Sequence, residues 1–104
     1  MSDKNLTVIA KIKAKPGMEE TLKKELLALI PPTRTDEGFI NYDLHQSIDD
    51  PALFVFHENW TSKAMLEAHL QKPHLVAFGE KAESLLAEPL EIIQCEMISD
   101  PAQP

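Results

Sequence analysis

The residues of this chain that are best suited to chemistry gather in one short segment. Residues 56–78, FHENWTSKAMLEAHLQKPHLVAF, contain three of the four histidines, the only tryptophan and the carboxylate Glu58. Histidine has an ordinary pKa that lets it exchange a proton near neutral pH, and it is also a frequent metal ligand. The segment therefore predicts a metal site, a catalytic pocket, or a seam between a strand and two helices.

A metal site is the least favoured of these three interpretations. His69 and His74 are five residues apart with Pro73 between them, whereas two ligands on one helix need a spacing of four residues on an unbroken turn. A third ligand would have to come from His57, His45 or Glu58 through folding. The single cysteine, Cys95, excludes a zinc site built of several thiolates and a disulfide within the chain. We predict no metal.

The elements around this segment follow from hydrophobic periodicity. Alternating apolar residues predict strands over residues 5–14, 39–47, 53–60 and 90–97. An apolar stripe at helical spacing predicts a helix over residues 18–30, which Pro31 and Pro32 end or kink. Thr61-Ser62 provides an N-cap for a short helix through about Leu70, and Pro73 starts the next helix.

The resulting order, β-α-β-β-α-β, is typical of a ferredoxin-like α+β domain with helices on one face of an antiparallel sheet. At 104 residues the chain forms a single domain over residues 1–104, with its core at about 5–98 and a loose C-terminal tail. The other face of the sheet is too apolar to meet water. We therefore predict a homodimer in which two sheets face each other.

Charge and hydropathy limit the partners. The net charge is -7, and no basic patch is present that would bind nucleic acid or an anionic membrane surface. The N-terminal apolar run is short and interrupted by lysines, so it predicts neither a signal peptide nor a membrane span. The expected location is the cytoplasm.

Several of these pieces together resemble a known family. The segments KPG at 15–17, EGFINYDLHQS at 37–47 and FVFHENWTSKAMLEAHLQKPH at 54–74, with Phe78, resemble the antibiotic biosynthesis monooxygenase family and in particular its small quinol monooxygenase-like members. The resemblance covers about residues 5–98. It implies a dimeric α+β barrel with a pocket between helices and sheet in each subunit. It also implies oxidation of a quinol or phenolic substrate by molecular oxygen without a metal, flavin or haem.

A haem-degrading branch of similar proteins is a poorer match. That branch has an axial histidine in the second helix and an asparagine in the first strand. The corresponding positions here are Phe78 and a residue near Ala10, although Trp60 matches the tryptophan of that branch. Without an axial ligand, haem iron would not be held in a defined way. We therefore predict no cofactor.

Oxygenation without a cofactor needs a base that removes a proton from the substrate. His69 or His74 would be that base, and Glu58, on the same strand face as Trp60, would orient a histidine and raise its pKa. Each of these residues also has a purely structural interpretation: Trp60 as a core residue, His74 as a helix cap, Glu58 as a buried ion-pair partner. The candidates that would bind substrate are Trp60, Tyr42, Phe78 and, beside Asp43, His45.

Two other functions stay open at this point. Some similar proteins with a P-H motif isomerise small phosphorylated signal molecules, but the three glycines of this chain form no phosphate-binding loop. The third possibility is a dimer that binds a small aromatic ligand without catalysis. Fold alone does not separate these possibilities, because function depends on the site.

Overall fold

Four antiparallel strands form one sheet in the computed structural model, which describes residues 5–100. The strands are β1 (Leu6–Lys13), β2 (Phe39–Gln46), β3 (Leu53–Trp60) and β4 (Glu91–Glu96). Their order across the sheet is β2-β3-β1-β4, so that β1 and β3 are central. This topology confirms the predicted ferredoxin-like α+β fold.

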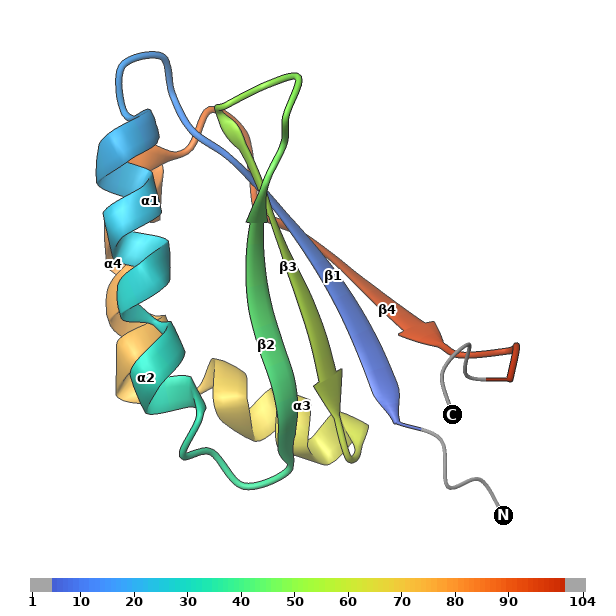
Figure 1. Cartoon of the computed structure of the whole chain (residues 1–104). Helices are drawn as coiled ribbons and strands as arrows, with labels where there is room; N and C mark the ends of the chain where they lie inside the picture. The colour runs from blue at the N-terminus through green and yellow to red at the C-terminus, as the bar shows by residue number, and fades with distance from the viewer. Residues whose placement is uncertain (1–4, 101–104) are drawn as a thin grey trace.

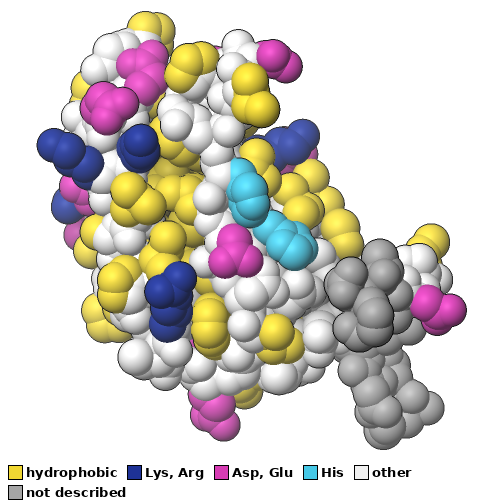
Figure 2. Space-filling view, in the orientation of Figure 1, with side chains coloured by type: hydrophobic (Ala, Val, Ile, Leu, Met, Phe, Trp, Pro, Cys, Tyr) yellow, Lys and Arg dark blue, Asp and Glu magenta, His cyan; other side chains and the backbone are white. Residues whose placement is uncertain are grey.

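Four helices cover one face of this sheet (Figure 1): α1 (Glu19–Ala28), α2 (Ile30–Thr33), α3 (Lys63–Leu70) and α4 (Pro73–Leu85). Helices α1 and α4 run along the length of the sheet, and α3 crosses its end. Hydrophobic side chains fill the seam between helices and sheet in the space-filling view (Figure 2). Among residues 5–100, no helix has the length and apolar character needed to cross a membrane.

The core follows the alternation of the strands. On β1, Val8, Ala10 and Ile12 point to the helices and are buried, as the strand pattern predicts. The helices contribute Leu22 and Leu26 of α1, which belong to the predicted apolar stripe. The remaining buried core side chains include Phe54, Phe56, Trp60, Leu66, Phe78 and Leu85. The predicted tail lies partly outside the described residues, which end at position 100.

The prolines break the helices in two different ways. Pro73 is the first residue of α4, so the second helical region divides into α3 and α4, as predicted. Pro31 and Pro32 lie within the short α2, where proline is tolerated because first-turn amides have no helical partner. The chain therefore continues one turn beyond the predicted helix end, which places Thr33 in the interior with none of its surface exposed.

The sheet face opposite the helices is partly polar. The Thr7 hydroxyl donates to Asn59 Oδ1 at 2.6 Å, and Asn59 Nδ2 donates to Asn41 Oδ1 at 2.8 Å. These bonds cross β1, β3 and β2 in turn. Ile9 and Val55 lie on the same face and are half-buried. This face therefore mixes apolar side chains with hydrogen-bonded amides and with exposed charged side chains such as Lys11 and Asp43, so it is less apolar than predicted.

Gly38 fixes the loop between α2 and β2 against α3. Its φ of +81° lies in the left-handed region, and a Cβ at this position would overlap the side chain of Met65. Its carbonyl also accepts the amide N–H of Thr61 at 3.0 Å. Because the loop is held so closely, its other side chains have fixed positions relative to α3.

We predict that Gly38→Ala destabilises the protein more than Gly17→Ala does. Gly17 has a similar φ of +87°, so both substitutions share a conformational cost of about 1–2 kcal/mol. A Cβ at Gly17 would meet no atom within 4 Å, whereas at Gly38 the overlap with Met65 costs about 1–3 kcal/mol more. Urea denaturation measures both losses. Equal losses would show that the loop does not pack tightly on α3.

Candidate functional site

The break at Pro73 brings His69 and His74 together. Ser62 caps α3 by accepting the amide N–H of Met65 at 3.2 Å, and His69 then lies in the last turn of that helix. The chain reverses, and His74 follows in the first turn of α4. The two imidazole centroids are 5.9 Å apart, with His69 only 2% exposed and His74 half-buried. The expected proximity of the two rings to the helix–sheet seam is therefore present.

Asp36, in the loop before β2, holds the buried histidine. Its Oδ2 lies 2.8 Å from Nδ1 of His69, and both side chains are buried. Burial lowers the pKa of His69, while the hydrogen bond and charge of Asp36 oppose that change. Because Nδ1 of His69 is hydrogen-bonded to Asp36, Nε2 is the ring nitrogen that can contact a ligand. The carboxylate that contacts His69 is therefore Asp36, and not Glu58 as predicted.

Glu58 has a different partner. Its Oε1 accepts the indole N–H of Trp60 at 2.9 Å, across the two-residue spacing that places both on one strand face. Burial raises the pKa of Glu58 to about 7, and the Trp60 bond only partly offsets this. Glu58 is therefore a carboxyl group that exchanges its proton near neutral pH.

Tyr42 and Thr33 complete the polar groups around the histidines. The Thr33 hydroxyl lies 3.0 Å from Nε2 of His74. Burial raises the pKa of the Tyr42 hydroxyl, the charge of Glu58 adds to the rise, and Thr33 opposes it. The Tyr42 ring stacks on Phe56 at a centroid distance of 4.3 Å. Tyr42 thus keeps its proton and is available as a hydrogen-bond donor.

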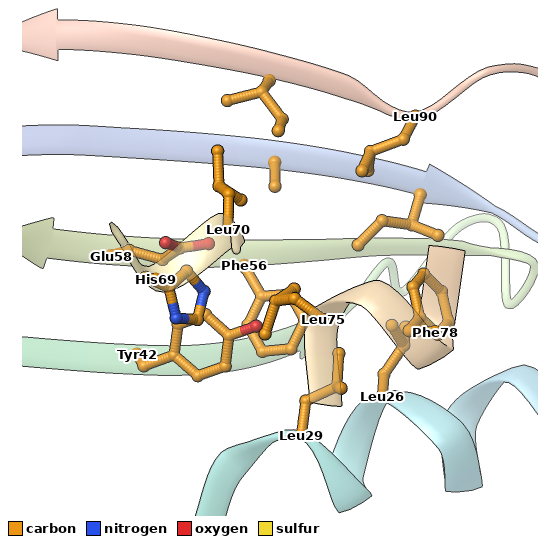
Figure 3. Close-up of a pocket in the computed structure, with 13 residues that line it drawn as sticks. Leu26, Leu29, Tyr42, Phe56, Glu58, His69, Leu70, Leu75, Phe78 and Leu90 are labelled. Atoms are coloured by element: carbon orange, nitrogen blue, oxygen red, sulfur yellow. The ribbon is translucent and has the colours of Figure 1, made fainter. Parts of the chain in front are cut away.

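A narrow cavity opens between these groups and the helices (Figure 3). Tyr42, Glu58 and His69 are its only polar lining residues within the described chain, and its volume is about 40 Å³. The labelled apolar side chains that surround them are Leu26, Leu29, Phe56, Leu70, Leu75, Phe78 and Leu90. An aromatic ring needs more room, since benzene occupies engineered cavities of about 150 Å³. Leu70 and Leu90 are 36% and 41% exposed, so they have space to move aside.

The other predicted site residues lie at different distances from this cavity. Phe78 lines it, as expected for a substrate wall. Trp60 is fully buried beside His69, at a centroid distance of 4.5 Å, and does not line the cavity. His74 does not line the cavity, although its ring centroid lies 5.9 Å from that of His69. His45 is exposed on the opposite face of the sheet, away from this cavity.

Sequence reasoning did not identify Asp36 and Thr33. Both lie in the segment TRTDEG, which the sequence marks only as a turn. The available signal was the presence of small polar residues directly after a proline-terminated helix and before a glycine. Their partners, His69 and His74, are 33 and 41 residues away, so no local pattern connects them.

The fold and this cavity define a small ferredoxin-like protein with acid–base groups on an otherwise apolar lining. Residues 5–81 match the family model of the antibiotic biosynthesis monooxygenases. The "Probable quinol monooxygenase YgiN" of Escherichia coli K12 is 32% identical over 93 residues, which cover 80% of this chain and 89% of that protein. The crystal structure of PA3566 from Pseudomonas aeruginosa superposes with a TM-score of 0.87 at 40% identity, over 92% of this chain and 96% of that one.

A third relative is longer than this chain. The protein sll1783 of Synechocystis is 34% identical over 88% of this chain, but this region is only 62% of that relative's length. The family model and the relative from Escherichia coli both cover most of the chain. The chain therefore belongs to the antibiotic biosynthesis monooxygenase family, which confirms the predicted resemblance.

We predict that Glu58→Gln removes a pH dependence of stability. The folded-state pKa of about 7 lies above the ordinary 4.5, so Glu58 stabilises the fold fully below pH 4.5 and loses this contribution as pH rises to 7. At about 1.4 kcal/mol per pKa unit, the loss is about 3 kcal/mol. Glutamine has no such titration and can still accept the Trp60 N–H. Urea denaturation between these pH values measures the difference between the two proteins, and a constant difference would contradict the prediction.

Proposed function

We propose that this protein is a cofactor-independent monooxygenase that oxidises a quinol or related phenolic compound with molecular oxygen. The observation that carries the proposal is the contact between buried Asp36 and His69 at the wall of an apolar cavity. A fixed imidazole beside an apolar hollow is the arrangement that deprotonation of a phenol requires. A cytoplasmic location remains part of this proposal.

His69 acts as the base in the proposed reaction. Its Nε2 takes a hydroxyl proton from the quinol, while Asp36 holds Nδ1–H and stabilises the imidazolium that forms. Tyr42, which keeps its own proton, donates a hydrogen bond to the phenolate oxygen. This role for Tyr42 rests on its position in the cavity lining and on its raised pKa.

The substrate itself supplies all the electrons. The quinol anion transfers one electron to oxygen, and the two radicals join to form a carbon–oxygen bond, which gives a hydroperoxide. Loss of water from that hydroperoxide, with the proton returned by His69, leaves a hydroxyquinone. The sum is one quinol and one oxygen molecule converted to one hydroxyquinone and one water. Separation from bulk water protects the radical pair until the bond forms.

The lining of the cavity is a poor match for the isomerase alternative. A phosphorylated substrate needs cations or a cluster of amide donors. No lysine or arginine lines the cavity among residues 5–100, and Glu58 adds a negative charge when it is ionised. The remaining alternative, ligand binding without catalysis, predicts that the protein binds a hydroquinone without oxygen uptake.

We predict that oxygen uptake with a hydroquinone depends on His69. His69→Ala removes the base and should lower the rate about 10²–10⁴-fold, the usual contribution of a general base. Asp36→Asn keeps the shape of the side chain but no longer stabilises the imidazolium, so its loss should be smaller. An oxygen electrode and a panel of hydroquinones, with chelated buffers, measure these rates.

His57→Ala is the matched control, because His57 is exposed on the other face of the sheet, outside the cavity, and should leave the rate unchanged; sedimentation checks that the variant assembles as the wild type does. His74→Ala distinguishes the two histidines that the sequence left open. A variant of His69 with full activity would refute its role as the base. Tight binding of the hydroquinone without oxygen uptake by the wild type would favour the binding protein.

We further propose that the protein is a homodimer joined through the open face of the sheet. Ile9 and Val55 are half-buried there in the single chain, next to the bonded amides of Asn59 and Asn41. A second copy would remove these apolar side chains from water, and its sheet offers the same groups in return. Because the amides already bond one another, their burial in an interface would leave few groups unsatisfied.

We predict that Val55→Glu dissociates this dimer. A buried carboxylate without a partner strongly disfavours association, so the variant should sediment as a monomer at concentrations where the wild type is dimeric. Ile48→Glu is the control, because Ile48 is 98% exposed in the loop between β2 and β3. Sedimentation equilibrium measures all three proteins. A wild type that is monomeric at high concentration would refute the interface.

A further inference from the structure

We propose that Asp36, His69 and His74 form a binding site for one divalent transition metal ion of the zinc type. One ligand atom from each of the three side chains lies within 4.8 Å of the other two. Neutral imidazole and carboxylate are ligands that Zn²⁺ accepts, and three protein ligands leave a fourth position open. The two histidines lie on different helices and Asp36 lies in a distant loop, so ligand spacing along one helix did not predict this cluster.

The three ligand atoms need only small shifts to hold an ion. Ligand atoms on a tetrahedral zinc ion with bonds of about 2.1 Å lie about 3.4 Å from one another. Asp36 Oδ2 and His69 Nδ1 are hydrogen-bonded at 2.8 Å, so an ion bound between them must displace the Nδ1 proton and separate the two atoms by about 0.6 Å, while the third ligand must move by about 1–2 Å. That ligand is His74, which is half-buried at the start of α4 and must either give up the contact of its Nε2 with the Thr33 hydroxyl or bind through Nδ1.

Lys72 competes with a metal ion for the same carboxylate. Its Nζ lies 4.0 Å from Oδ1 of Asp36, and its side chain is 46% exposed. The lysine can therefore swing into solvent when an ion binds, but its positive charge close to the site opposes the ion. Removal of this charge should strengthen metal binding, whereas a purely structural cluster would show no such effect.

Metal binding would also prevent His69 from acting as the proposed base. A neutral imidazole has one proton and one free electron pair, so coordination through either nitrogen leaves the proton on the other nitrogen. His69 could then no longer accept a proton from a substrate. This consequence rests on the proposed oxygenase function, while the binding of the ion does not.

The test uses full-length protein without an affinity tag, stripped of metal. Zn²⁺ is titrated by calorimetry and Co²⁺ by visible absorption. We expect one ion per chain, and an affinity that falls at least about tenfold in His69→Ala, His74→Ala and Asp36→Asn. Lys72→Gln should bind a few-fold more tightly, and His57→Ala should bind as the wild type does. Thermal unfolding followed by circular dichroism confirms that each variant is folded.

Three results would overturn the site. The first is absence of Zn²⁺ binding at concentrations on the order of 1 mM, where even weak complexes form. The second is unchanged affinity in the folded His74→Ala variant, which alters the least buried of the three ligands. The third is a sulfur-to-cobalt charge-transfer band, which would place the ion at Cys95. Metal binding that is lost in these variants but does not slow oxygen uptake would support the site and refute His69 as the base.

Discussion

The contact between Asp36 and His69 is the constraint on which the rest of this site depends. It joins the loop after α2 to the last turn of α3, two segments that are 33 residues apart in the chain. Both side chains lie in the interior, where a carboxylate without a partner is costly. The contact with His69 therefore stabilises the position of the loop, together with the packing of Gly38 on Met65. The Asp36 contact fixes the imidazole at the cavity and leaves its second nitrogen free.

The two walls of the cavity keep their titratable groups in separate environments. On the helical side, Asp36 stabilises the charged form of His69 against the effect of burial. On the sheet side, Glu58 accepts the Trp60 N–H, but burial dominates and the carboxyl group retains its proton at higher pH. The same low polarity thus lowers the pKa of one group and raises that of the other. The cavity therefore contains one group with a lowered pKa and one with a raised pKa, because their partners differ.

Local patterns predicted the elements well where the signal was periodic. The two-residue spacing on β3 correctly placed Glu58 and Trp60 on one strand face, and Pro73 marked the division between α3 and α4. Pro31 and Pro32 were harder to interpret, because proline ends one helix and is equally compatible with the first turn of another. The extra turn of α2 changes the position of Thr33, and no propensity distinguishes the two outcomes. Glu58 was assigned to the correct strand face but to the wrong partner.

The sequence by itself determined the fold class, the sheet faces and the candidate residues between positions 56 and 78, because these depend on periodicity and on residue type within one element. Only the tertiary structure decided which of those residues meet. Asp36 contacts His69, and Thr33 contacts His74, because helix packing places the end of α2 and the loop after it against the turn between α3 and α4. Contacts between distant segments depend on how the helices pack on the sheet, and the spacing of residues along the chain does not predict that packing.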